Sequence, residues 1–211
     1  MNDKKIVFAT GNEGKMREIR EILKDLGMEI LSMKEAGVTL DIVEDGNTFG
    51  DNAELKARAV WKETGGIVLA DDSGLVVDCL NGEPGILSAR YMGEDTSYEI
   101  KNQNILDRAS HAKGSERSAR FICNIAAVLP DGQVLHTEES MEGLLADRPA
   151  GEEGFGYDPI LYIPEFGATS AQLTLDQKNK ISHRGKALEA MKGRLIEIFT
   201  GGENHESTDC Q

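Results

Sequence analysis

The sequence predicts an α/β domain built on one mixed β-sheet. In the first half of the chain, apolar runs of strand length alternate with segments whose apolar residues recur at helical spacing, which is typical of α/β proteins. Further on, two strand-like runs flank the turn PDG, residues 130–132, and predict an antiparallel hairpin. A sheet that combines both patterns is mixed, and ligands of such sheets tend to bind beyond the carboxyl ends of strands.

The first half of the chain supplies two strands and two helices. Lys5 to Ala9 is the first expected strand, and the helix after it has apolar residues at helical spacing, namely Met16, Ile19, Ile22, Leu23 and Leu26. A second helix begins near Asn47 and Thr48 and ends at Gly65-Gly66. Its apolar face consists of Phe49, Ala53, Ala57, Val60 and Trp61. The next strand, Ile67 to Ala70, runs directly into Asp71.

The second half adds more strands and two helices. Val76 to Leu80 is a further strand, and a helix from Tyr98 to Ala109 carries Tyr98, Asn102, Ile105, Leu106 and Ala109 on one side. The hairpin strands are Phe121 to Leu129 and Gln133 to Met141. Ile160 to Ile163 is another short strand. Ser182 caps a last helix, whose expected inward side chains are Leu188, Met191, Leu195, Ile198 and Phe199.

Length and composition fit one soluble domain over residues 1–200, with room for two lobes. The chain has 211 residues, is 39% hydrophobic and has no apolar run long enough to span a membrane. Its opening has no apolar core of signal-peptide length, so we expect a cytoplasmic protein. Cys79, Cys123 and Cys210 are scattered, which argues against disulfides and a cysteine metal site. The polar residues 201–211 are expected to form a disordered tail.

The acidic charge balance limits the partners of the chain. The 23 basic and 37 acidic residues give a formal net charge of −14, which repels polyanions, so we expect no nucleic-acid partner. A small anionic substrate remains compatible with this charge. It needs a cleft in which cations or a divalent metal ion are concentrated against the background.

The segment ATGNEGK, residues 9–15, is a candidate phosphate-binding loop. Gly11 and Gly14 allow a close turn, and Lys15 stands at the beginning of a helix whose N-terminus favours an anion. The spacing differs from a Walker A motif, in which four residues separate the first glycine from the Gly-Lys pair and a Ser or Thr follows that pair. An ordinary strand-to-helix turn with a solvated lysine is the alternative.

Two adjacent carboxylates, Asp71 and Asp72, follow a strand. One interpretation is an exposed turn in which Asp72 or Ser73 caps a local structure. The apolar residues on both sides favour another, a pair held at the end of a buried strand, where the two charges repel unless a proton is shared or a cation intervenes. Mg²⁺ meets this need because it takes oxygen ligands and also contacts substrate phosphates.

Two further segments carry candidate binding residues. In EDGNTFGDNAELKA, Asn52 and Lys56 are four residues apart and share a helix face. This face either presents an amide and an amine to an oxyanion or is an ordinary surface pair exposed to solvent. The segment GFGYDP, residues 154–159, places two aromatic residues between glycines. It is either a compact loop that stacks on a flat ring or an apolar turn entering a strand.

His183 and Arg184 open the last helix. The positive end of the helix dipole disfavours cations there unless an anion or an electron-rich group lies nearby. A lone histidine is usually structural, but this position indicates a use for both side chains.

Five segments in this order resemble a known family: TGNEGK, EDGNTFGDNAELKA, LADDSGLVVDCLNGEPGILSARY, GFGYDPI and ISHRGKA. The set is similar to the non-canonical purine nucleoside triphosphate pyrophosphatases, also called the inosine triphosphatase or XTP/dITP diphosphatase family. The resemblance runs from about Ile6 to Phe199, and five weak segments in the right order make it specific.

The resemblance implies a Mg²⁺-dependent hydrolase that cleaves dITP, ITP or XTP between the α- and β-phosphates, giving the monophosphate and pyrophosphate. Such enzymes keep deaminated purines out of nucleic acids. The resemblance also implies an elongated, two-lobed α/β fold with the active-site cleft between the lobes, and a homodimer.

The resemblance further implies residue roles. Asp72 matches the proton acceptor and, with Glu44, a metal ligand, while Lys56 matches a catalytic, substrate-facing lysine. Asp71 is left with a supporting role. The substrate-binding positions are Thr10, Gly11, Asn12, Glu13, Gly14, Lys15, Ser73, Phe155, Gly156, Tyr157, Asp158, Lys178, His183 and Arg184, the last two near the base. Asp51 departs from the Glu that is common in the family, and residues 93–118 match none of its motifs.

The chemistry of these residues agrees with such a reaction. Attack of water on a polyphosphate needs cations that neutralise charge, which Lys15, Lys56 and Lys178 supply. A 6-oxo purine needs hydrogen-bond donors, which His183 and Arg184 supply. GTP shares the 6-oxo group, so its rejection must involve the 2-amino group, for which the sequence identifies no residue. A nucleotide sensor without turnover, and a related pyrophosphatase with another base preference, such as the septum-associated ones, stay open.

Overall fold

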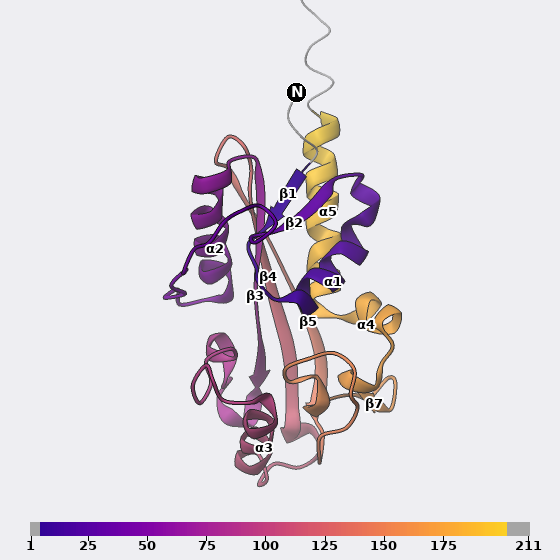
Figure 1. The fold of residues 1–211 in the computed structure, drawn as a ribbon. Helices are drawn as coiled ribbons and strands as arrows, with labels where there is room; N and C mark the ends of the chain where they lie inside the picture. Colours follow the sequence, from indigo (N-terminus) through magenta and orange to yellow (C-terminus); the bar gives the residue numbers. More distant parts are fainter. Residues whose placement is uncertain (1–4, 202–211) are drawn as a thin grey trace, which may run out of the picture.

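One seven-stranded sheet forms the frame of the molecule in the computed structural model, which describes residues 5–201 (Figure 1). The strands lie in the order β2-β1-β3-β4-β5-β6-β7. Their bounds are β1 Lys5–Phe8, β2 Glu29–Ser32, β3 Ile67–Val77, β4 Ser118–Val128, β5 Val134–Leu145, β6 Leu161–Ile163 and β7 Ala168–Thr169. Strand β1 pairs in parallel with β2 and β3, and the other pairs are antiparallel. The predicted mixed α/β sheet is confirmed.

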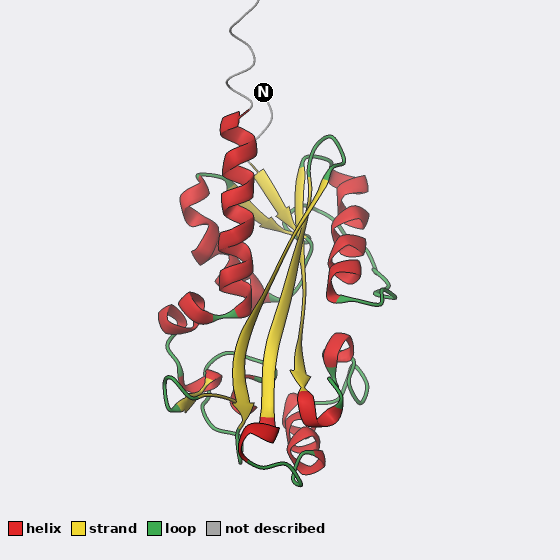
Figure 2. Cartoon of the chain, turned by 180° about the vertical axis from the view of Figure 1, so that it is seen from behind, coloured by secondary structure: helices red, strands yellow, loops and turns green. Residues whose placement is uncertain are grey.

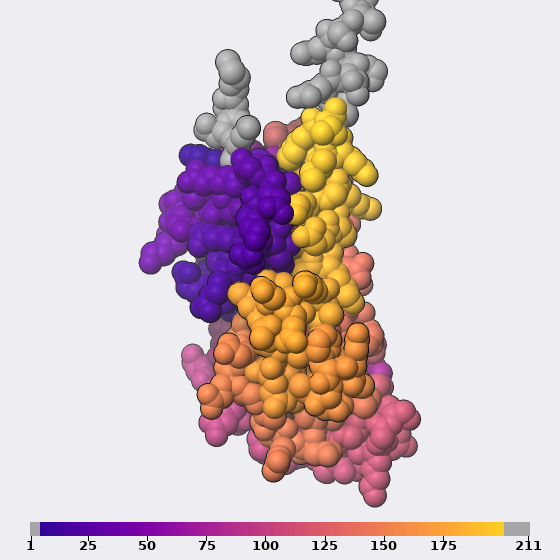
Figure 3. All heavy atoms as spheres, turned by 90° about the vertical axis from the view of Figure 1, so that its right-hand side faces the viewer, coloured from indigo at the N-terminus to yellow at the C-terminus, as the bar shows by residue number. Residues whose placement is uncertain are grey.

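Residues 5–201 also contain five α-helices: α1 Glu13–Leu23, α2 Phe49–Thr64, α3 Tyr98–Arg108, α4 Leu175–Ile181 and α5 His183–Gly201. In the upper lobe, α1 and α5 lie on one face of the sheet and α2 on the other (Figure 1). The long strands β3, β4 and β5 run on into a lower lobe, where α3 packs (Figure 2). Figure 3 shows the yellow α5 beside the indigo N-terminal segment, with the orange residues before α4 continuing below them.

Each lobe has its own buried core. On one face of the upper lobe, side chains of β1 and β3 pack with α1 and α5, among them Phe8, Ile19, Leu69, Leu188 and Met191. On the other face, β3 and β4 pack with α2, through Val68, Ala70, Ala53, Ala57 and Val60. The lower core joins β3 to α3 and to the loop before β6, through Leu75, Val77, Ile105, Tyr157 and Ile160. The cores are separate, and the long strands β3, β4 and β5 extend from one lobe into the other.

The strand β3 differs from the prediction in a way that matters for the site. We expected two strands, Ile67 to Ala70 and Val76 to Leu80, with Asp71 and Asp72 after the first. This expectation is wrong, because β3 continues from Ile67 to Val77 and pairs with β4 along its length, Asp71 opposite Ile125 and Asp72 opposite Asn124. The pairing of β1 with β3 ends at Leu69, so the two carboxylates lie just beyond the parallel part of the sheet.

The helix predictions are confirmed in part. Thr48 caps α2, and Asp51, the departure from the family pattern, completes its capping box by accepting the backbone N–H groups of Asn47 and Thr48, each at 3.0 Å. In α5, the residues Leu188, Met191 and Leu195 are buried as expected. Ile198 and Phe199 are not inward, since they are 40% and 38% exposed in the last turns, beyond the edge of the core.

Three elements were not predicted: β2, α4 and β7. They have only four, seven and two residues, too short for an apolar repeat to show in the sequence. The expected tail begins one residue too early, because Gly201 still belongs to α5, and residues 202–211 lie outside the described residues. No helix within residues 5–201 has the length and apolar character needed to cross a membrane.

Gly74 lets β3 pass closely under the turn that carries Ser88. A Cβ at this position would overlap the carbonyl of Gly85 and lie 2.5 Å from Ser88 Oγ and 2.8 Å from the ring of Phe49. We therefore expect Gly74→Ala to lower the free energy of unfolding by about 1–3 kcal/mol, measured by urea denaturation. The control is Gly193→Ala in α5, where the space is open and the change should be neutral or stabilising by up to about 1 kcal/mol. Equal effects at both positions would contradict the tight packing at Gly74.

Candidate functional site

A cavity lies where the two lobes meet, beside the middle of β3. The predicted site residues that line it are Asn12, Lys15, Glu44, Lys56, Asp72, Ser73, Phe155, Gly156, Tyr157, Asp158, Lys178, His183 and Arg184. A second cavity shares Lys15, Glu44 and Lys56 with the first and adds Thr10 and Gly11. Gly14 lies against the ring of Phe155, where an added Cβ would be 3.1 Å away. Glu13 is exposed and lines neither cavity.

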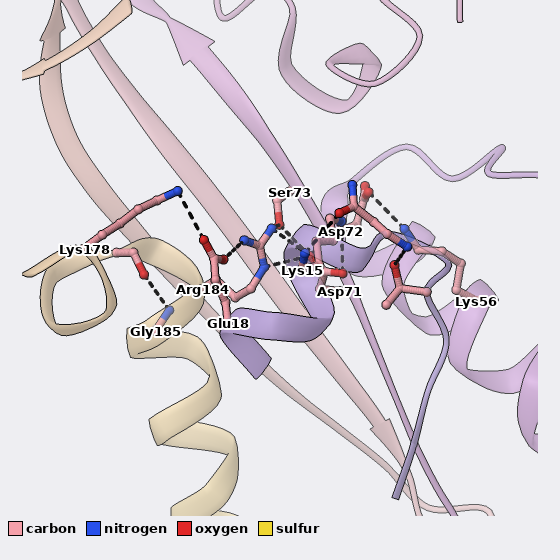
Figure 4. A network of polar contacts seen from close by, with 12 residues as sticks. Lys15, Glu18, Lys56, Asp71, Asp72, Ser73, Lys178, Arg184 and Gly185 are labelled. Atoms are coloured by element: carbon pink, nitrogen blue, oxygen red, sulfur yellow. Dashed lines mark hydrogen bonds and ion pairs between the residues drawn. The ribbon is translucent and has the colours of Figure 1, made fainter. Parts of the chain in front are cut away.

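Asp71 faces α1 and α5 and is surrounded by donors (Figure 4). Lys15 Nζ lies 2.9 Å from its Oδ2 and 3.0 Å from its Oδ1, Ser73 Oγ donates at 2.9 Å, and Arg184 donates at 3.2 and 3.3 Å. Burial raises the pKa of Asp71, but Lys15, Arg184 and Lys56 outweigh it and hold the pKa far below its usual range. Asp71 is therefore a permanent carboxylate that binds α1 and α5 to the strand.

Asp72 faces the opposite side of the sheet, toward α2. Lys56 Nζ lies 3.2 Å from its Oδ1 and Asn52 Nδ2 donates to its Oδ2 at 3.2 Å. Burial raises the pKa of Asp72, and the charge of Glu44 adds to this, while Lys56 opposes it without cancelling it. Asn52 and Lys56 thus lie on one face of α2, as predicted, and both contact Asp72. The raised pKa means that Asp72 takes up a proton more readily than an ordinary aspartate.

The repulsion between the adjacent aspartates is offset in a different way from the one expected. Successive residues of a strand point to opposite faces, and Asp71 bonds directly to Lys15 and Arg184, whereas Asp72 bonds directly to Lys56. The charges of Lys15 and Lys56 nevertheless act on both carboxylates. The premise that the pair lies at the end of a strand is wrong, so no ion needs to lie between the two carboxylates.

Glu44 and Asp72 are the residues with the arrangement to hold a metal ion. Both approach the same ammonium, Lys56 Nζ, at 3.0 and 3.2 Å. Burial lowers the pKa of Lys56, but Asp72, Asp71 and Glu44 more than restore it, so the lysine stays charged. Within residues 5–201, no three His, Cys, Asp or Glu side chains gather to hold a metal by themselves. Two converging carboxylates fit an ion such as Mg²⁺, which fills its other positions with water and substrate phosphates.

Glu18 of α1 lines neither cavity but pairs with two residues that do, and the sequence reasoning missed it. It is buried, pairs with Arg184 Nη1, and lies 3.2 Å from Lys178 Nζ (Figure 4). Burial raises the pKa of Glu18, but Arg184 and Lys178 lower it further, so that it stays ionised. Its signal in the sequence is a charged residue between Met16 and Ile19, on the buried face of an amphipathic helix.

The loop GFGYDP is held by Asp158. Its carboxylate accepts the backbone N–H of Phe155 at 2.8 Å, the hydroxyl of Ser170 at 2.8 Å and Lys178 Nζ at 2.8 Å. Lys178 Nζ also lies 5.1 Å from the centre of the Phe155 ring. Asp158 therefore organises the loop and its lysine, and the Phe155 ring is left to form a wall of the cavity.

His183 and Arg184 have different surroundings at the start of α5. The guanidinium of Arg184 donates to Asp71, Glu18 and Ser73. The two carboxylates are the anions that a cation at a helix N-terminus requires. His183 stacks on Phe121 with ring centres 5.0 Å apart, and its Nδ1 is buried without a hydrogen-bond partner. Burial and the charge of Arg184 lower the pKa of His183 well below its usual value, so the imidazole is neutral.

The cavity thus has two chemically distinct ends. The cationic end is formed by Lys15 and Lys56 with the loop Thr10–Lys15. The aromatic end is lined by the predicted residues Phe155, Gly156 and Tyr157. It is also lined by residues that the sequence reasoning did not find, namely Leu75, Ser88, Ala89, Tyr98 and Phe121. Asp72 and Glu44 line the same cavity, so the geometry suits a ligand with an anionic chain on a flat ring and a proton transfer between the two.

Comparisons with known proteins agree with this geometry. The model of the Ham1 family matches residues 6–194. A dITP/XTP pyrophosphatase of Clostridium perfringens is 47% identical over 202 residues, which cover 93% of this chain and 99% of the relative. A dITP/XTP pyrophosphatase of Thermus thermophilus is 49% identical over 198 residues, 94% and 93% of the two chains. The structure of a HAM1 protein from Coxiella burnetii has a TM-score of 0.83 at 42% identity and covers 92% of this chain and 98% of its own.

The ion pairs of Glu18 predict a stability that depends on pH. Because the folded pKa of Glu18 is lowered, its ionised form stabilises the protein above the ordinary value of 4.5, and this contribution is lost as the pH falls through the folded value. Wild-type protein should therefore exceed Glu18→Gln in unfolding free energy at about pH 7, and the difference should shrink toward about pH 3 in urea titrations. The exposed Glu197→Gln is the control. A difference for Glu18→Gln that does not change with pH would refute the assignment.

Proposed function

Because this chain belongs to the Ham1 family, we infer that it is a nucleoside triphosphate pyrophosphatase that hydrolyses the non-canonical purine nucleotides dITP, ITP and XTP to the monophosphate and pyrophosphate. This activity removes deaminated purines from the nucleotide pool. The observation that carries the inference is one cavity that is lined by Lys15 and Lys56, by aromatic side chains and by the buried carboxylate of Asp72.

The cationic end suits the triphosphate. Lys15 and Lys56 bring two ammonium groups to the cavity of a chain whose net charge is −14. Both are paired with carboxylates, so a divalent cation would supply the further positive charge that a polyanionic substrate needs. Asn12 caps α1 by accepting the N–H of Lys15 at 3.0 Å, and the loop from Thr10 leads into the positive end of that helix. Phosphate oxygens would be bound by this loop, as the positive ends of helices favour.

Asp72 is proposed as the proton acceptor for the water that attacks the phosphate chain. Asp72 is buried, and Asn52 and Lys56 fix its orientation. Lys56 would stabilise the charge that develops on the phosphates. Glu44 and Asp72 would hold Mg²⁺, which when bound neutralises negative charge on the phosphates. Asp71 takes no part in the proton transfer and instead holds Lys15 and Arg184 in place.

The aromatic end suits the purine base. Phe155 is placed to stack on a flat ring, and Tyr157 is held by the hydrogen bond from its hydroxyl to the Ser88 carbonyl at 2.7 Å. His183 is neutral and lines the cavity, so a ring N–H can donate to a 6-oxo group. Arg184, whose guanidinium already bonds Asp71 and Glu18, would contribute chiefly by positioning its neighbours. Lys178 and Ser73 complete the substrate contacts.

We also propose a cytoplasmic homodimer. Val43, Leu87 and Met92 are large apolar residues exposed by 71%, 51% and 49%. Arg90 donates to the backbone carbonyl of Glu44 at 2.8 Å and so ties the loop that carries Val43 to the segment that carries the other two. An apolar surface of this kind favours contact with a second copy of the chain.

The products of dITP hydrolysis test the proposed reaction. With Mg²⁺ we expect deoxyinosine monophosphate and pyrophosphate in equal amounts, and EDTA should lower the rate at least about 100-fold until Mg²⁺ is added back. A panel with XTP, ATP, GTP and dTTP tests the base preference. Release of inorganic phosphate would contradict the cleavage position, and binding without products would indicate a sensor. Equal rates on ATP or dTTP would indicate a pyrophosphatase of another preference.

A further inference from the structure

The loop that carries Glu44 is held by side chains. Residues 39–47 lie between β2 and α2, and within residues 5–201 no hydrogen bond joins their backbone groups to another backbone group. Among the side chains that hold the loop are Arg90, whose Nη1 donates to the backbone carbonyl of Glu44 at 2.8 Å, and Asn52, whose Oδ1 accepts the N–H of Gly46 at 2.9 Å. The position of Glu44 therefore depends on other parts of the chain.

The two cations that bond Glu44 use different parts of it. Lys56 Nζ lies 3.0 Å from the carboxylate oxygen Oε2, which is an oxygen that a metal ion would take as a ligand. Arg90 bonds the backbone carbonyl and uses neither carboxylate oxygen. An ion on the carboxylate would compete with Lys56 but not with Arg90, so the bond from Arg90 is compatible with a bound ion.

Arg90 belongs to a segment that is fastened to the strand of Asp72. Two residues before Arg90, the Oγ of Ser88 accepts the backbone N–H of Leu75 at 2.9 Å. Leu75 lies three residues after Asp72 in β3. Arg90 thus connects the loop of Glu44 to the strand that carries the other proposed metal ligand.

The residues on either side of Arg90 are held as well. The carbonyl of Ala89 accepts the ammonium of Lys101 at 2.8 Å, and the hydroxyl of Tyr91 donates to Oδ1 of Asn104 at 2.7 Å. Both partners belong to α3. The side chain of Arg90 therefore extends from a backbone that is fixed at both neighbouring positions.

The contacts of Arg90 indicate a role toward Glu44. Arg90 is half-buried, and none of the ion pairs found within residues 5–201 includes it. The hydrogen bond that its side chain makes within these residues goes to the Glu44 carbonyl. Arg90 lines neither of the two cavities that the proposed ligands and the cationic loop share, which argues against direct contact with a nucleotide.

We propose that Arg90 is a positioning residue for the metal site, because it fixes the backbone of Glu44 relative to β3 and so sets the separation of Glu44 from Asp72. Mg²⁺ demands near-ideal distances to its ligands, and two ligands from separate segments meet this demand only if the segments are held together. The proposal rests on the proposed function, in which these two carboxylates hold Mg²⁺. It also gives a role to the end of the segment LADDSGLVVDCLNGEPGILSARY, for which the sequence indicated none.

The first test is the Mg²⁺ dependence of pyrophosphate release from dITP. In Arg90→Met we expect the half-saturating concentration of free Mg²⁺ to rise at least about tenfold, as is usual when a residue that holds a metal ligand is lost. At saturating Mg²⁺, kcat and the KM for dITP should stay within about threefold of the wild type. Arg90→Gln is a second neutral variant in case methionine prevents folding, which circular dichroism and thermal denaturation establish.

The second test measures metal binding without turnover. Mn²⁺ alone is titrated onto the protein and the free ion is followed by electron paramagnetic resonance, and we expect its Kd to be at least about tenfold higher in Arg90→Met than in the wild type. Removal of a positive charge by itself strengthens the binding of a cation, so a weaker affinity identifies the lost bond rather than the lost charge. In a Glu44→Gln background, Arg90→Met should change the Kd by less than about threefold.

A matched control removes a similar bond elsewhere. Arg194 Nη1 donates to the backbone carbonyl of His136 at 2.9 Å, and Arg194 lines neither cavity. Arg194→Met should therefore leave both the Mg²⁺ dependence and the Kd for Mn²⁺ unchanged.

Three results would overturn the proposal. The first is a folded Arg90→Met with the Mg²⁺ dependence and the Mn²⁺ affinity of the wild type. The second is a raised KM for dITP at saturating Mg²⁺ with unchanged Mn²⁺ affinity, which would make Arg90 a substrate contact. The third is equal binding of Mn²⁺ by the wild type and Glu44→Gln, which would remove Glu44 as a ligand. If the wild type with Mg²⁺ releases no pyrophosphate from dITP, the proposed function has failed instead, and the Mn²⁺ titration still decides the role of Arg90.

Discussion

The uninterrupted pairing of β3 with β4 is the constraint on which the site depends. Because the strand does not break at Asp71-Asp72, two adjacent carboxylates point to opposite faces of one sheet. One face is covered by α1 and α5 and the other by α2, so each carboxylate is bonded directly by different cations. The different surroundings of two chemically identical residues follow from strand geometry.

The environments on the two faces suit different tasks. Asp71 is enclosed by Lys15, Arg184 and Ser73, and with Glu18 it ties the loop at the start of α1 to the start of α5. Asp72 has fewer positive neighbours and shares Lys56 with Glu44, which leaves its proton affinity raised. A carboxylate held in a network of ion pairs and one with a raised pKa are thereby placed next to each other, and the lower lobe supplies the aromatic side chains of the cavity.

Local patterns in the sequence predicted the elements with clear periodicity or caps, such as α2 with Thr48 and the hairpin of β4 and β5. They failed where the decisive partner is distant in the chain. Asp71 and Asp72 resemble the end of a strand, because nothing local shows that β4 continues the pairing past Leu69. Glu18 and Lys101 each sit on a helix as ordinary charged residues, and only the fold buries them against Arg184 and Ala89. The candidate site was found mainly through the family resemblance.

The measurement that tests the central claim most directly is turnover of dITP by Asp72→Asn beside Asp71→Asn, each with its urea denaturation curve. The separation of roles predicts that Asp72→Asn stays folded and loses at least about 100-fold in kcat. It predicts that Asp71→Asn loses about 3–5 kcal/mol of stability, because Lys15 and Arg184 lose a buried partner. Near-normal turnover by Asp72→Asn, or a stable but inactive Asp71→Asn, would contradict the account.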